Sequence, residues 1–74
     1  METICKNDYK GDGIYIDLET SYNPYENLIL NHYKYLDKKK KYYFYCEKGI
    51  ASKKVTEVLS AYGYDVTRVI NDNT

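Results

Sequence analysis

The sequence has no surplus of charge, because eleven basic side chains are balanced by eleven acidic ones. It therefore lacks the long-range field that draws proteins to nucleic acids or anionic membranes, and we expect neither partner. Long hydrophobic runs are missing too, since the apolar stretches fall far short of the ~18 residues that span a bilayer. Residues 1–10 also lack the apolar core of a signal peptide. These absences predict a soluble protein of the cytoplasm.

Metal-binding and disulfide patterns are also scarce. The two cysteines, Cys5 and Cys46, lie far apart without a CxxC spacing, so they predict neither a zinc knuckle nor a disulfide framework. The only histidine is His32. We therefore expect no metal site.

The rest of the sequence alternates between stretches typical of strands and stretches typical of helices. A chain of 74 residues makes one domain, residues 1–74, with a small core. The predicted strands are residues 3–5, 14–18, 42–46 and 64–70, and the predicted helices are residues 24–36 and 53–62. This order predicts an α/β fold with a small, mostly parallel β-sheet and helices packed on its faces.

Each predicted helix has recognisable ends. Asn23 is a good N-cap, Pro24 suits the first helical position, and Glu26 can reach back as in a capping box. Its apolar face would be made up of Tyr25, Leu28, Ile29, His32 and Leu36. In the second helix Ser52 can act as the cap, and Gly63 supplies a left-handed stop. Its apolar face would be made up of Val55, Val58, Leu59 and Tyr62.

Residues 37–46 contain a charged connector followed by an apolar stretch. We interpret DKKKK, residues 37–41, as a solvated turn, with an electrostatic docking patch as the alternative. The continuous apolar character of YYFYC, residues 42–46, is typical of a central strand covered on both faces. Ligands of open α/β sheets gather at the carboxyl ends of strands, so Cys46 is a candidate site residue.

The loop after Cys46 leads directly into a helix. A helix N-terminus presents unpaired N–H groups and a partial positive charge, both of which stabilise a thiolate. Gly49 allows a positive φ that turns successive N–H groups toward the sulfur, as in an anion nest. We therefore expect Cys46 at the mouth of an anion-binding loop. The alternative is an inert, buried cysteine at the end of a core strand.

Residues 42–72 resemble the C-terminal half of a rhodanese-like (thiosulfate sulfurtransferase) domain. The resemblance rests on the strand at 42–45, Cys46, Gly49, Ser52, the helix start Lys53-Lys54, and Gly63-Tyr64-Asp65-Val66. A weaker similarity covers residues 34–46 and the strand at 14–18, in which Asp17 matches the strand-end aspartate of that family. The resemblance implies a short, divergent member.

The resemblance also implies a chemistry for Cys46. Its thiolate would be the catalytic nucleophile, which takes a sulfane sulfur from a donor, holds it as a persulfide and passes it to a thiol acceptor or cyanide. Asp17 would support the site, and no metal or organic cofactor is required. The persulfide would lie in an anion-binding loop made up of Glu47, Lys48, Gly49, Ile50, Ala51 and Ser52.

The sequence departs from the family pattern in this loop. Glu47 and Ala51 stand where active members carry arginine, so the bidentate grip on anions is lost and thiosulfate is expected to be a poor substrate. The alternative function is a catalytically weak rhodanese-like interaction or sensing module. A phosphatase is not expected, because Ser52 stands where the phosphatase loop requires arginine.

Three further residues and the length of the chain complete the predictions. Cys5 is either structural or a resolving cysteine that attacks a Cys46 persulfide. His32 is expected to pack on the face of its helix rather than to act as a base. The Asp17 carboxylate either accepts a hydrogen bond from the loop or caps a turn. The chain is short for the family, so we expect a truncated fold with an exposed sheet edge that favours a homodimer.

Overall fold

The computed structural model describes residues 2–18, 25–47 and 49–71. In chain order its elements are β1 (Glu2–Cys5), the 3-10 helix η1 (Lys6–Asp8), β2 (Ile14–Asp17), α1 (Tyr25–Leu30), α2 (His32–Tyr35), β3 (Lys41–Tyr45), α3 (Ile50–Ala61) and β4 (Asp65–Ile70). The predicted α/β class is confirmed, and each predicted strand is present within a residue or two of its predicted bounds. None of the described helices is long and apolar enough to cross a membrane.

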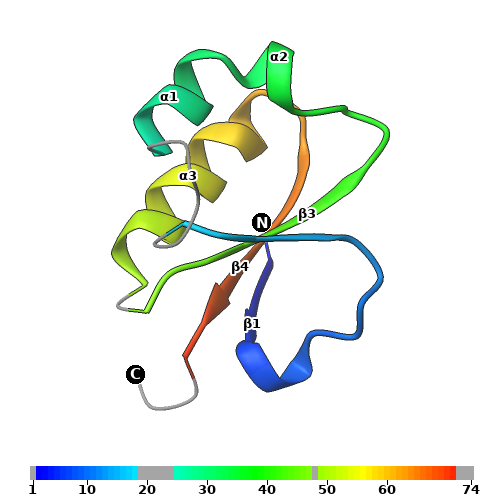
Figure 1. Ribbon diagram of the computed structural model, residues 1–74, viewed down its shortest axis with the longest axis vertical. Helices are drawn as coiled ribbons and strands as arrows, with labels where there is room; N and C mark the ends of the chain where they lie inside the picture. The colour runs from blue at the N-terminus through cyan, green and yellow to red at the C-terminus, as the bar shows by residue number, and fades with distance from the viewer. Residues whose placement is uncertain (1, 19–24, 48, 72–74) are drawn as a thin grey trace.

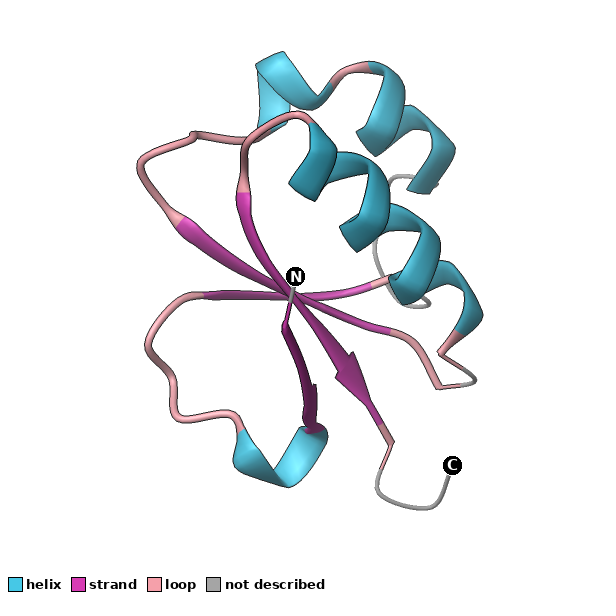
Figure 2. Ribbon diagram, turned by 180° about the vertical axis from the view of Figure 1, so that it is seen from behind, coloured by secondary structure: helices cyan, strands magenta, loops and turns pink. Residues whose placement is uncertain are grey.

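The four strands form one parallel sheet in the order β1-β4-β3-β2. The chain steps in one direction from β2 through β3 to β4, so right-handed crossovers place α1, α2 and α3 on the same face. The connection from β1 to β2 runs the other way across the sheet, which places η1 on the opposite face. Figures 1 and 2 show this division, with the three α-helices on one side and η1 on the other.

The central strand β3 is buried on both faces, as its apolar sequence predicts. Successive side chains alternate across a strand, so Tyr42 and Phe44 face the helices, while Tyr43 and Tyr45 face the other way. The core on the helical face is made up of Leu28, Leu36, Tyr42, Phe44, Val55, Leu59, Tyr64 and Val66. The smaller core on the opposite face is made up of Tyr43, Tyr45 and Val69, with Ile4, Tyr9 and Tyr15 packed against it.

The first predicted helix is divided in two at Asn31. This residue has φ −117° and ψ 30°, outside the helical region, and its carbonyl accepts the Lys34 N–H at 2.9 Å as α2 begins. Asparagine competes with a continuous helix because its side chain favours caps and turns. Leu28 and Leu36 are buried as predicted. The predicted start at Asn23 and Pro24 and the side chain of Glu26 lie outside the described residues.

The second predicted helix begins earlier than expected. The residue before α3 is Gly49, with φ 75°, so Ser52 lies inside the first turn and is not the N-cap. The left-handed stop at Gly63 is confirmed, with φ 95°. Of the predicted apolar face, Val55 and Leu59 are fully buried, whereas Tyr62 is 50% exposed. The early start matters for function, because it brings Ser52 over the end of β3.

Candidate functional site

Cys46 lies directly after β3, beneath the first turn of α3. Tyr45 faces away from the helices, so the next residue in the alternation faces them. The Cys46 sulfur accepts a hydrogen bond from the Ser52 backbone N–H at 3.2 Å, and in the thiol form it donates to Ser52 Oγ at 3.4 Å. The first amides of a helix have no partner within the helix, so the sulfur satisfies one of them. The sulfur therefore lies at the N-terminus of α3, where the backbone dipole is positive.

The thiol is buried, which corrects the expectation of a sulfur presented at an open mouth. Cys46 is 2% exposed and Ser52 is completely buried. The Gly49 N–H donates to the Cys46 carbonyl at 3.3 Å and closes a tight turn directly after the cysteine. A molecule from solvent can therefore reach the sulfur only if residues around it move.

Among the described residues of the loop, the backbone amides have different partners. The amide that reaches the sulfur is that of Ser52, whereas the amide of Gly49 bonds the Cys46 carbonyl. The positive φ expected at Gly49 is confirmed, but it closes the turn rather than aiming that amide at the sulfur. Glu47 is exposed, Ala51 is half-buried, and Ile50 is 75% exposed. Lys48 lies outside the described residues.

Arg68 in β4 is a residue of this site that the sequence interpretation missed. Its Nη2 donates to the Gly49 carbonyl at 2.8 Å, so it ties the loop to the neighbouring strand. Its Nε is buried and has no hydrogen-bond partner among the described residues. A signal was present in the sequence, because Arg68 is the only arginine in a chain rich in lysine and interrupts the apolar pattern of DVTRVI.

Asp17 does not share the Cys46 side of the sheet. Its strand partner is Tyr45, which belongs to the core on the face opposite the helices. Asp17 and Cys46 therefore face opposite sides of the sheet, although both lie at the carboxyl ends of their strands. On its own side Asp17 lines a shallow hollow together with Lys6, Tyr9 and Tyr15.

Cys5 lies at the same edge of the sheet as Cys46, but β4 separates them. Cys5 pairs with Ile70, and Cys46 follows Tyr45, the partner of Val69. Two strand spacings put their Cα atoms roughly 10 Å apart. A disulfide requires Cα atoms within about 7 Å, so Cys5 cannot attack a Cys46 persulfide without a movement of the backbone.

His32 packs against aromatic rings, as expected. Its Nδ1 lies 2.7 Å from the Tyr64 hydroxyl, and its ring stacks on that of Tyr62 with centroids 4.5 Å apart. These contacts join α2 to the end of α3 and the residue before β4. In the described ranges, no three histidine, cysteine or acidic side chains gather in a way that could hold a metal ion.

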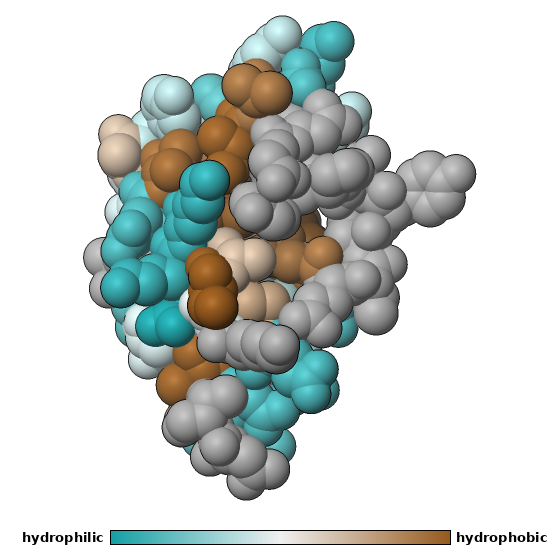
Figure 3. Space-filling model, turned by 90° about the vertical axis from the view of Figure 1, so that its left-hand side faces the viewer, coloured by the Kyte–Doolittle hydropathy of each residue, from teal (hydrophilic) through white to brown (hydrophobic). Residues whose placement is uncertain are grey.

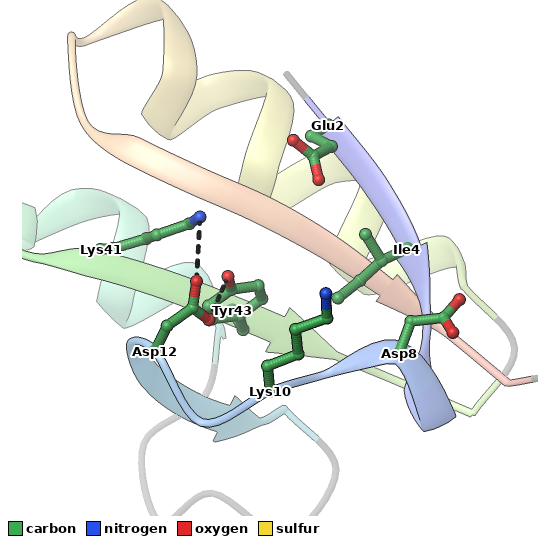
Figure 4. A pocket seen from close by; sticks show the side chains of 7 residues that line it. All are labelled: Glu2, Ile4, Asp8, Lys10, Asp12, Lys41 and Tyr43. Carbon is green, nitrogen blue, oxygen red and sulfur yellow. Dashed lines mark hydrogen bonds and ion pairs between the residues drawn. The ribbon is translucent and has the colours of Figure 1, made fainter.

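A second hollow, of about 340 Å³, lies under the β1–β2 connection on the face opposite the helices. Figure 4 shows that Asp12 reaches back from this connection to β3, where it accepts the Tyr43 hydroxyl at 2.6 Å and pairs with Lys41 at 3.6 Å. The hydrogen bond from Tyr43 lowers the pKa of Asp12 below its ordinary value. The same bond raises the pKa of Tyr43. The Asp12 carboxylate thus joins the β1–β2 connection to Tyr43 and Lys41 of β3. These interactions stabilise the fold.

Comparisons with known proteins add no relative to this picture. No family model, curated protein or solved structure matches the chain significantly. The case for a function therefore rests on the residues around Cys46.

Proposed function

We propose that the protein carries sulfur as a persulfide on Cys46 and passes it to an acceptor thiol, as the likeness of residues 42–72 to a rhodanese-like domain implies. The observation that carries the proposal is the hydrogen bonding of the Cys46 sulfur to Ser52. The backbone N–H and the hydroxyl of that residue both lie within hydrogen-bonding distance of the sulfur. Both can donate to a thiolate, and donors held in a dry environment act more strongly than donors in water.

The proposed reaction is an exchange of sulfur between two thiols. The Cys46 thiolate attacks the outer sulfur of a donor persulfide, R–S–S⁻, so that a bond forms between the two sulfurs and the donor S–S bond breaks. The donor leaves as the thiolate R–S⁻, and Cys46 retains the persulfide. In the second half an acceptor thiolate attacks the outer sulfur and regenerates Cys46. No electrons are gained or lost overall.

The surface around the loop favours an organic donor over thiosulfate. Glu47 is exposed, Ile50 is 75% exposed, and the loop between Cys46 and Ser52 contains no arginine. Figure 3 views the molecule from the side where α3 begins and shows hydrophobic surface interspersed with hydrophilic surface there. The loop itself offers no guanidinium to a dianion, whereas the organic part of a persulfide can contact the exposed isoleucine. The proposed donor is therefore a low-molecular-weight or protein-bound persulfide.

The test is the mass of the intact protein after incubation with an organic persulfide such as that of glutathione. We expect the addition of one sulfur atom on the wild type and on Cys5→Ala, and no addition on Cys46→Ala. Subsequent incubation with excess thiol should remove the added sulfur. Equal addition to Cys46→Ala, or none to the folded wild type, would contradict the proposal.

The burial of Cys46 favours a second candidate, an interaction or sensing module that performs little catalysis. A cysteine that is 2% exposed is shielded from reagents in solution, and Ile50, the first residue of α3, is 75% exposed. A protein partner that contacts Ile50 could change the conformation of the loop between Cys46 and α3. Binding of a specific partner to the wild type and to Cys46→Ala alike, together with the absence of sulfur transfer, would favour this candidate.

A further inference from the structure

Arg68 occupies a position at which the fold would accept an apolar side chain. It pairs with Phe44 across the sheet, and it lies on the helical face of β4 between Val66, which is buried, and Ile70. It is half-buried, and its Nε has no hydrogen-bond partner among the described residues. Burial of an unsatisfied donor destabilises a fold, so an arginine at this place calls for a specific reason.

The contact with Gly49 supplies that reason. The guanidinium donates to the Gly49 carbonyl at 2.8 Å, and that carbonyl also accepts the Lys53 N–H at 3.3 Å as α3 begins. The Gly49 N–H in turn bonds the Cys46 carbonyl. One guanidinium on β4 thus holds both the turn over the cysteine and the first turn of the helix that donates to its sulfur.

The approach of the two residues is close. A Cβ atom on Gly49 would lie 2.7 Å from Arg68 Nη2 and 3.7 Å from Ile70 Cγ2. The loop therefore rests directly on the guanidinium. Because Arg68 is half-buried, its charge is screened less by salt than those of the exposed Lys53 and Lys54.

We propose that Arg68 is the positioning residue of the Cys46 loop and supplies the fixed positive charge that the loop itself lacks. This inference adds a positioning residue to the proposed function, and the role of Arg68 in sulfur transfer rests on that function. Arg68 acts in two ways: its hydrogen bond sets the conformation of the turn, and its charge favours anions at the sulfur, including the Cys46 thiolate and the persulfide.

The test compares two alkylating reagents of similar size on a Cys5→Ala background, in which Cys46 is the only cysteine. Iodoacetate is an anion and iodoacetamide is neutral, so the ratio of their rates reports the electrostatic potential at the sulfur. We expect Arg68→Leu to lower this ratio several-fold. Arg68→Lys should restore most of the ratio because it retains the charge. Lys34→Gln, which removes an exposed charge on α2, should leave the ratio unchanged.

Arg68→Gln separates the hydrogen bond from the charge. Its amide can donate to the Gly49 carbonyl without carrying a charge, so we expect a ratio as low as that of Arg68→Leu. An unchanged ratio in Arg68→Leu, or failure of Arg68→Lys to restore it, would overturn the proposal. If Arg68→Leu does not fold, which thermal unfolding would show, the Lys and Gln variants decide the question by the same ratio.

The measurement distinguishes the two proposals because alkylation needs no persulfide. A shifted ratio together with no sulfur on the wild type would refute sulfur transfer and retain the role of Arg68 at the loop. An unchanged ratio with sulfur transfer intact would refute the role of Arg68 alone.

Discussion

The backbone amide of Ser52 donates a hydrogen bond to the sulfur of Cys46 across 3.2 Å and so joins the first turn of α3 to the end of β3. This contact exists because α3 begins at Ile50, which leaves the Ser52 amide without a partner inside the helix. The serine side chain points to the same sulfur, with its Oγ 3.4 Å away. The amide and the hydroxyl belong to a completely buried residue, so each should affect the reactivity and the stability of the site.

Replacement of Ser52 by alanine removes the hydroxyl and leaves the amide in place. Loss of one buried hydrogen bond should lower the free energy of unfolding by about 1 kcal/mol and slow sulfur uptake by roughly fivefold. Ser60→Ala, near the other end of α3, should change the uptake rate little. The rates are measured by the time course of intact mass, and an uptake rate equal to that of the wild type would show that the hydroxyl does not act on the sulfur.

Substitutions of Gly49 and Gly11 can be compared to test the contact between the Cys46 loop and Arg68. Both have φ near 75°, but a Cβ on Gly11 meets nothing, whereas a Cβ on Gly49 meets the Arg68 guanidinium. Gly11→Ala should therefore cost only the backbone strain, about 1 kcal/mol, and Gly49→Ala about 1–3 kcal/mol more. Urea denaturation measures both values. Equal losses would indicate that the arginine moves aside without cost.

Leu59 and Leu30 test the core on the helical face. Leu59 is completely buried against β3 and β4, and its replacement by alanine should cost about 2–5 kcal/mol. That loss is a large part of the total stability of a small domain, so much of the variant should be unfolded at 37 °C. Leu30 is 75% exposed, and Leu30→Ala should cost less than about 0.5 kcal/mol. Circular dichroism during thermal unfolding distinguishes the two.

The contact of Asp12 with Tyr43 should make stability fall at both ends of the pH range. The folded protein lowers the pKa of Asp12 through the hydrogen bond from Tyr43, so this contribution is present above about pH 3.9 and is lost as the pH falls through the lowered value. The pKa of Tyr43 is raised by the same bond. That contribution is present below about pH 10 and is lost as the pH rises through the raised value.

Asp12→Asn tests the acidic limb of that profile. The amide does not titrate, so the urea midpoint of this variant should depend less on pH between about pH 2 and 5 than that of the wild type. The neighbouring Asp8 serves as the control, because it is exposed on η1. A profile for Asp12→Asn that matches the wild type would show that other carboxylates cause the acid loss.

The sequence by itself determined the α/β class, the places of the strands and the position of Cys46 at a strand end. These features follow from local periodicity and from turn residues such as Gly49 and Gly63, whose backbone conformations are set over a few neighbouring residues. The break at Asn31 and the start of α3 at Ile50 were missed, because helix boundaries depend on weak competition between caps and helical continuation.

Only the tertiary structure decided what surrounds the sulfur. The order β1-β4-β3-β2 places Arg68 beneath the loop, separates Cys5 from Cys46 by a strand, and turns Asp17 to the opposite face. Strand order and register join residues that are distant in the chain, and no local pattern encodes them. The sequence thus identified a cysteine before a helix, and the packing of the sheet determined that the cysteine is buried and that the only arginine holds its loop.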